Sequence, residues 1–191
     1  MSNSNQLLKP IETHYRGYRF RSWLEARWAV FFDRCGIEWT YEDQGFDLNG
    51  TPYLPDFWLP KWATFVEIKP DFLGLEKPLA MAKAGAEIMV LYGKPWPWEY
   101  GVWCNVQPGK TLIPFPTAQF YICLNCQRVG LKVLTPDGNL SIFTMYSSCK
   151  NCGEAAWVAP LPNGHWPGDG GCLQAAYAAA RKARFEHGES G

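Results

Sequence analysis

Hydrophobic residues recur at steps of three and four between residues 22 and 35. The apolar positions at these steps are Leu24, Trp28, Phe31, Phe32 and Cys35. This spacing predicts an amphipathic helix over Ser22–Cys35, and Gly36 supplies its stop. Glu25 lies in the first turn, three residues after Ser22, where it fits a capping box that bonds back to the Ser22 amide. A carboxylate at this place is favoured by the helix dipole whether it serves as a cap or in a site.

Shorter apolar segments follow this helix and predict strands. We expect strands at Ile37–Glu42, Gly45–Leu48, Tyr53–Pro60, Ala63–Pro70 and Glu87–Tyr92, a tight turn at Asn49-Gly50, and a helix within Asp71–Gly85 after a loop. The order helix, strands, helix, strand is typical of a mixed α/β domain. We expect this domain to span residues 1–93.

Three charged residues interrupt the two central strands. Asp56 follows Pro55 at the start of one apolar segment, and Glu67 and Lys69 lie on the next. The two-residue period of a strand sends Glu67 and Lys69 to one face and Ile68 to the other. Charges in so apolar a setting are costly unless they are paired or hold a metal, so these residues are the candidates for a site.

The rest of the chain differs in composition. Residues 94–118 contain five prolines and several tryptophans and are predicted to be a linker. Residues 119–158 hold two C-x-x-C pairs, separated by 22 residues: Cys123 with Cys126, and Cys149 with Cys152. This spacing predicts a structural four-thiolate zinc site in a zinc ribbon, with a hairpin around Pro136-Asp137-Gly138 between the pairs. A redox dithiol is the alternative. Residues 159–191 are expected to form a loop and an alanine-rich helix.

Composition narrows the class of protein. The chain has 191 residues, of which 47% are apolar, and its formal net charge is zero. It is therefore long enough for a packed core, and no global charge indicates a nucleic-acid or membrane partner. We expect a soluble cytoplasmic protein, because no apolar segment approaches the roughly 20 residues of a membrane span. The basic segment Tyr15–Ser22 would place Arg19 and Arg21 on one face if extended; it either contacts phosphates or is a solvated basic edge.

The set of Glu25, Asp56, Glu67 and Lys69 resembles the PD-(D/E)XK nuclease superfamily, whose fold is restriction-endonuclease-like. More narrowly, four segments look like a group of small phage-type nuclease-like proteins: Tyr15–Ser22, Leu24–Ala29, Tyr41-Glu42 and Tyr53–Trp58. The resemblance covers roughly residues 13–93, and the zinc pairs and alanine-rich tail are also similar to that group. Pro70 departs from the pattern, since a glycine is more usual after the lysine, and it is expected to end its strand early.

The resemblance implies a mixed sheet flanked by helices, followed by the zinc ribbon and the C-terminal helix. It also implies a magnesium- or manganese-dependent endonuclease acting on nucleic acid, with DNA rather than RNA as the expected substrate. Asp56, Glu67 and the Ile68 carbonyl would hold the ion, which suits the oxygen ligands that magnesium prefers. Lys69 would orient or deprotonate the attacking water, and Glu25 would join through water or bind a second ion.

Two other functions fit the same residues. The Glu67 and Lys69 charges could form an ion-pair network in a non-catalytic adaptor that binds nucleic acid or protein. The other alternative is a thiol-redox protein built on the C-x-x-C pairs. Cutting both strands would need two copies of the domain, so a homodimer is possible, but no segment predicts a dimer helix. Apart from the resemblance, the residues themselves do not indicate DNA or RNA, single or double strands, or any site specificity.

Overall fold

The computed structural model describes residues 12–71, 73–96, 101–104, 117–123, 126, 128–134, 151–152 and 171–185. The elements in chain order are β1 (Thr13–Tyr15), β2 (Tyr18–Phe20), α1 (Trp23–Arg34), β3 (Thr40–Tyr41), β4 (Phe46–Asp47), β5 (Pro52–Tyr53), β6 (Phe57–Leu59), the 3-10 turn η1 (Pro60–Trp62), β7 (Thr64–Lys69), α2 (Glu76–Lys83), β8 (Ile88–Tyr92), β9 (Gly101–Cys104), β10 (Thr117–Ile122), β11 (Val129–Leu134) and α3 (Gly171–Lys182). The protein is thus mixed α/β, as the sequence predicts.

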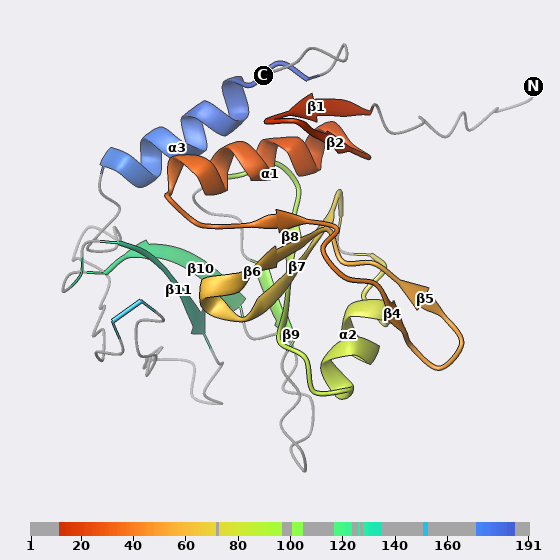
Figure 1. Cartoon of the computed structure of the whole chain (residues 1–191). Helices are drawn as coiled ribbons and strands as arrows, with labels where there is room; N and C mark the ends of the chain where they lie inside the picture. The colour runs from red at the N-terminus through yellow and green to blue at the C-terminus, as the bar shows by residue number, and fades with distance from the viewer. Residues whose placement is uncertain are drawn as a thin grey trace, which may run out of the picture.

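A seven-stranded sheet in the order β11-β10-β9-β8-β7-β6-β3 forms the centre of the molecule (Figure 1). Among the described strands, β7 and β8 form the only parallel pair. Parallel neighbours need a crossover connection, and the segment containing α2 supplies it. The pairs β1–β2 and β4–β5 form two separate two-stranded sheets, and β1–β2 lies against helix α1 (Figure 1).

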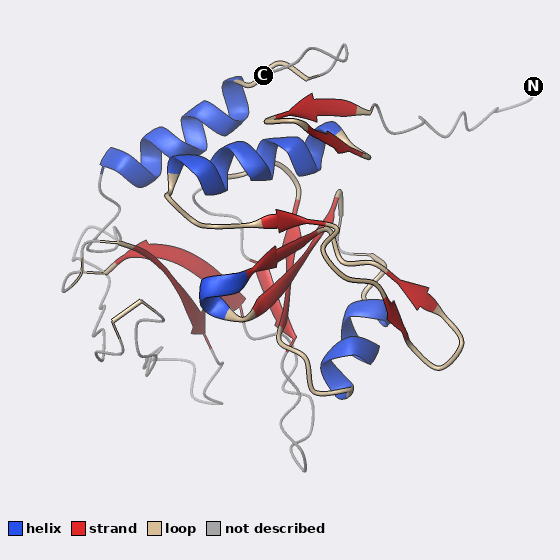
Figure 2. Cartoon of the chain, viewed as in Figure 1, coloured by secondary structure: helices blue, strands red, loops and turns tan. Residues whose placement is uncertain are grey.

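Helices α1 and α3 lie side by side over one face of the sheet (Figures 1 and 2). Four of the five apolar positions predicted for this helix are buried, and the fifth, Cys35, is half-buried at its C-cap. Phe31 packs on Tyr177 of α3 with ring centroids 4.6 Å apart. From the sheet, Val66 and Ile68 of β7 belong to the same core. The helix begins where predicted, because the Ser22 side chain caps it by accepting the Glu25 N–H.

A smaller core covers the opposite face. It joins α2 and β8 with Tyr53 of β5, and Phe65 of β7 packs against it. Since residues along a strand alternate between faces, Glu67 and Lys69 lie on the same face as Phe65. The charged residues of β7 are therefore on the α2 side of the sheet.

The sheet runs across the boundaries that the sequence suggests at residues 93 and 118. β9 pairs with β8, and β10 pairs with β9. β10 and β11 then form an antiparallel hairpin around the first cysteine pair. The hairpin expected around Pro136-Asp137-Gly138 lies outside the described residues, and so does most of the predicted linker.

Several elements are shorter than the sequence predicts. The strand expected at Ile37–Glu42 is reduced to the two residues of β3, and α2 begins only at Glu76. β7 ends at Lys69, directly before Pro70, as expected. Within the described ranges, no helix has the length and apolar character needed to cross a membrane.

Candidate functional site

Asp56, Glu67 and Lys69 lie together at one end of two neighbouring strands. Asp56 directly precedes β6, while Glu67 and Lys69 are at the end of β7. The strands are antiparallel, with Phe57 opposite Val66, so the start of β6 lies beside the end of β7. The Lys69 ammonium is 2.7 Å from Glu67 Oε1. The structure therefore brings this amine and this carboxylate to one face.

Asp56 is a buried carboxylate, with 4% of its surface exposed. Its Oδ2 accepts the Ile68 N–H at 2.7 Å, and its Oδ1 pairs with the Arg21 guanidinium at 3.0 Å. Burial raises the Asp56 pKa well above its usual range, and the charges of Glu67 and Glu25 raise it further. A cation at this place would favour the charged form of Asp56.

Glu67 is arranged in the same way. Its Oε2 accepts a hydrogen bond from the Tyr53 hydroxyl at 2.9 Å, and its Oε1 faces Lys69. In both Asp56 and Glu67, one oxygen is held by a neutral donor and the other faces a cationic side chain. The neutral donors fix the orientation of the carboxylates, and the oxygens that face cations are the natural ligand atoms for a metal ion.

The Ile68 backbone completes an oxygen-rich donor set. The N–H and C=O of one residue point to the same side of a strand, and the Ile68 N–H points to Asp56. Extending the β6–β7 register by two residues beyond the pair of Phe57 and Val66 sets Pro55 opposite Ile68. Proline has no N–H, so β6 offers the Ile68 carbonyl no ladder hydrogen bond. Two carboxylates and a carbonyl are the ligand types that suit magnesium or manganese.

Glu25 is both a helix cap and a neighbour of this group. Its carboxylate accepts hydrogen bonds from the Ser22 hydroxyl at 2.6 Å, the Arg21 N–H at 3.2 Å and the Tyr41 hydroxyl. The back-bond expected at the Ser22 amide is thus made to the Arg21 amide, one residue earlier. The charge of Glu25 still reaches Asp56, whose pKa it helps to raise. Burial and the bond to Glu25 raise the pKa of the Tyr41 phenol, which therefore stays a donor.

One cleft, with a volume of about 850 Å³, is lined by Glu25, Asp56, Glu67, Ile68 and Lys69, and also by their neighbours Arg21 and Tyr53. The β4–β5 hairpin and the start of α2 supply the rest of its lining, including Glu76 and Lys77. Gly74, at φ +76°, lies so close to Lys69 that a β-carbon there would be 3.6 Å from Lys69 Cε. The loop before α2 therefore passes directly against the lysine side chain. A cleft of this size holds small ligands or a segment of a polymer.

Sequence reasoning did not assign Tyr53 or Tyr41 to this site, and it did not connect Arg21 with Asp56. Each is far in sequence from the carboxylate it contacts: Tyr53 is 14 residues from Glu67, Tyr41 is 16 from Glu25, and Arg21 is 35 from Asp56. The available signal was weak: Tyr41 and Tyr53 lie in segments that carry the family resemblance, and Arg21 lies in a basic segment.

Three of the four predicted metal cysteines are close together. The sulfur atoms of Cys123, Cys126 and Cys152 lie within 4.8 Å of one another. Cys123 Sγ and Cys152 Sγ are 3.9 Å apart, which matches the roughly 3.8 Å expected between thiolates bound tetrahedrally to zinc at about 2.3 Å. The cluster could therefore bind a metal such as zinc. Cys149 lies outside the described residues.

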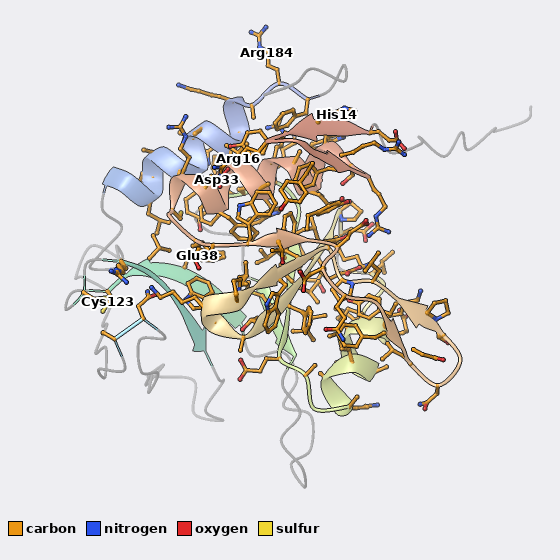
Figure 3. The ribbon with its side chains drawn as sticks, in the orientation of Figure 1. His14, Arg16, Asp33, Glu38, Cys123 and Arg184 are labelled. Carbon is orange, nitrogen blue, oxygen red and sulfur yellow. The ribbon has the colours of Figure 1, made fainter. Side chains whose placement is uncertain are left out.

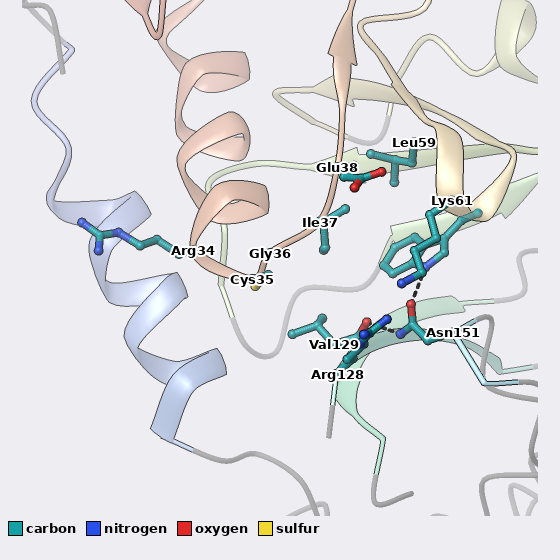
Figure 4. A pocket seen from close by; sticks show the side chains of 11 residues that line it. Arg34, Cys35, Gly36, Ile37, Glu38, Leu59, Lys61, Arg128, Val129 and Asn151 are labelled. Atoms are coloured by element: carbon teal, nitrogen blue, oxygen red, sulfur yellow. Dashed lines mark hydrogen bonds between the residues drawn. The ribbon is translucent and has the colours of Figure 1, made fainter. Parts of the chain in front are cut away.

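A second cleft, of about 480 Å³, lies where Asn151, next to Cys152, meets β11 of the sheet (Figure 4). The Asn151 side chain donates to a β11 carbonyl at 2.8 Å and accepts from the Trp62 indole at 3.5 Å. The charged residues that line this cleft are Arg34, Glu38, Lys61 and Arg128. None of the four residues predicted for catalysis lines it.

The chain matches no protein-family model, no curated protein and no solved structure. The geometry of the two sites therefore carries the functional argument.

Proposed function

We propose that this protein is a metal-dependent nuclease with a restriction-endonuclease-like fold, which hydrolyses phosphodiester bonds of nucleic acid, with DNA rather than RNA as the expected substrate. One observation carries the proposal: Asp56 and Glu67 each direct one oxygen to a cationic side chain while a neutral donor holds the other. The arrangement of the elements adds support. Glu25 of α1, Asp56 directly before β6, and Glu67 and Lys69 of β7 line the same cleft.

The residues divide the chemistry among them. Asp56, Glu67 and the Ile68 carbonyl would hold the ion. A divalent ion supplies charge stabilisation at the phosphate and makes a bound water a stronger acid near neutral pH. Lys69 Nζ would orient the attacking water or take its proton, and as an ammonium it would offset charge on the phosphate. Glu25 would act through water or at a second ion.

Cleavage assays test this function. Wild type, Asp56→Asn and Lys69→Ala are incubated with plasmid, single-stranded DNA, RNA and branched DNA, with magnesium or manganese. We expect cleavage by wild type and a loss of at least roughly 100-fold in both variants. Lys77→Ala is the matched control, because Lys77 lines the same cleft but donates to the Pro52 carbonyl. Equal cutting by wild type and Asp56→Asn would refute the nuclease assignment.

A binding adaptor is the second candidate. The Arg21–Asp56 and Glu67–Lys69 pairs neutralise the carboxylates within the protein, as they would in a domain without catalysis. Such an adaptor would bind nucleic acid equally well as wild type and as Asp56→Asn, and wild type would cut none of the substrates.

A further inference from the structure

The three arginines of the β1–β2 region have different partners. Arg16 pairs with Asp33 of α1 (Figure 3), and Arg19 pairs with Glu12 at 3.1 Å. Of these three arginines, only Arg21 lines the cleft that contains Asp56 and Glu67. The basic segment is therefore not one uniform edge, since a single member of it reaches the candidate site.

Arg21 is fixed at both its backbone and its side chain. Its N–H lies 3.2 Å from Glu25 Oε2 and 3.0 Å from the Tyr41 hydroxyl oxygen. Its guanidinium pairs through Nε with Glu42 and through Nη2 with Asp56. This arrangement holds the guanidinium at the mouth of the cleft before any ligand binds, which reduces the entropy lost on binding.

The guanidinium is nevertheless available to a ligand. Its side chain is 57% exposed, although its partner Asp56 is almost fully buried. A guanidinium has five N–H donors, and the two ion pairs use only part of that set. Its planar fork suits the oxygens of a phosphate. A phosphate oxygen bound to the second N–H of Arg21 Nη2 would lie within about 6 Å of Asp56 Oδ1, because two hydrogen bonds of about 3 Å to the same nitrogen would separate them.

We propose that Arg21 binds a phosphate of the nucleic-acid backbone beside Asp56, with Glu42 and Asp56 positioning its guanidinium. This inference rests on the proposed nuclease function and adds a substrate-binding residue to it. It also gives this cleft a means of holding a polyanion, since Arg21 and Lys69 offset part of the charge of the five carboxylates that line it.

Nucleic-acid binding by matched arginine variants tests the inference. The probe is a fluorescein-labelled DNA, single-stranded or duplex, with zinc-loaded protein and without magnesium or manganese, so that no cleavage occurs. We expect Arg21→Gln to bind roughly tenfold more weakly and its salt dependence to fall by about one phosphate contact. Arg21→Lys should be intermediate, because an ammonium lacks the fork. Arg19→Gln, with the same change of charge and an arginine of similar exposure, should change affinity less than about twofold.

A second measurement separates this inference from the proposed function. Manganese binding, followed by calorimetry, should survive in Arg21→Gln and be lost in Asp56→Asn. Equal DNA affinities of Arg21→Gln and Arg19→Gln would overturn the role of Arg21 whether or not the protein cuts. A wild type that neither binds manganese nor cleaves would overturn the nuclease function instead, and the DNA-binding comparison would still decide the role of Arg21. Thermal melting of each variant establishes that it is folded.

Discussion

At the scale of single residues, Asp56 carries its charge where burial opposes it. Its pKa is raised well above the ordinary 3.8, first by burial and then by Glu67 and Glu25. Between 3.8 and the raised pKa, the folded protein binds a proton that the unfolded chain has released. The contribution of Asp56 to stability is therefore complete below this window and is lost as the pH rises through the folded pKa.

We predict that Asp56→Asn is more stable than wild type at pH 8 without divalent ions, and that this advantage shrinks as the pH falls towards 4. Asparagine does not titrate, so the pH dependence of the difference belongs to Asp56. Urea unfolding of both proteins across this range measures it. Magnesium should stabilise only wild type, because only wild type keeps the ligand set. An advantage that is constant with pH would contradict the prediction.

The site shows what local sequence can and cannot predict. Glu67 and Lys69 are two residues apart on one strand, so the strand period alone places them on one face, as observed. The hydrogen bond from Tyr53 to Glu67 depends on how the β4–β5 hairpin folds over the sheet, which no local pattern specifies. The same holds for Arg21, which meets Asp56 across 35 residues of sequence. Glu25 was ambiguous because its capping role and its proximity to Asp56 both follow from one position.

At the scale of elements, Arg27 joins α1 to α3. It is 3% exposed, and its Nη1 donates to the carbonyls of Ala180 and Arg181 near the end of α3. Its guanidinium also lies over the Trp23 ring, 5.2 Å from the ring centroid. A cation at the C-terminal end of a helix is further favoured by the helix dipole.

We predict that Arg27→Ala lowers the free energy of unfolding by roughly 2–4 kcal/mol, because it removes a buried charge-assisted contact to two carbonyls. Chemical denaturation measures this loss. Arg184→Ala is the control, since Arg184 is exposed beyond α3 and should change stability by less than about 0.5 kcal/mol (Figure 3). Similar losses in both variants would show that α3 is not held through Arg27.

The elements themselves were predictable where a period was strong. The three- and four-residue steps predicted α1, and the buried run at residues 88–92 predicted β8. β10 was missed because its pairing with β9 joins segments on either side of a proline-rich stretch. Pairing between strands so placed is decided by tertiary contacts rather than by the local pattern.

At the scale of the whole molecule, the cysteine cluster is tied to the main core. Cys123 follows β10 directly, and its N–H donates to the Arg128 carbonyl at 2.9 Å. Phe120 of β10 packs on Phe31 of α1 with ring centroids 4.9 Å apart. Unfolding of the cysteine cluster should therefore also destabilise the sheet and helix α1.

We predict that the protein binds one zinc ion per chain and that removing it destabilises the whole chain in one transition. A loss of about 3 kcal/mol, typical of a structural cross-link, corresponds to a fall in Tm of roughly 6–12 °C for a chain of this size. Cys123→Ser and Cys149→Ser should lose zinc and melt as the chelated wild type does, the second because Cys149 is the predicted fourth ligand. Cys35→Ser should keep the zinc, since Cys35 lies outside the cluster.

Calorimetry combined with zinc analysis tests this prediction. Two unfolding transitions, of which the upper one is unchanged by chelation, would mean that the cysteine unit folds independently of the sheet. A reducible disulfide in a zinc-free protein would instead support a redox role for the thiols.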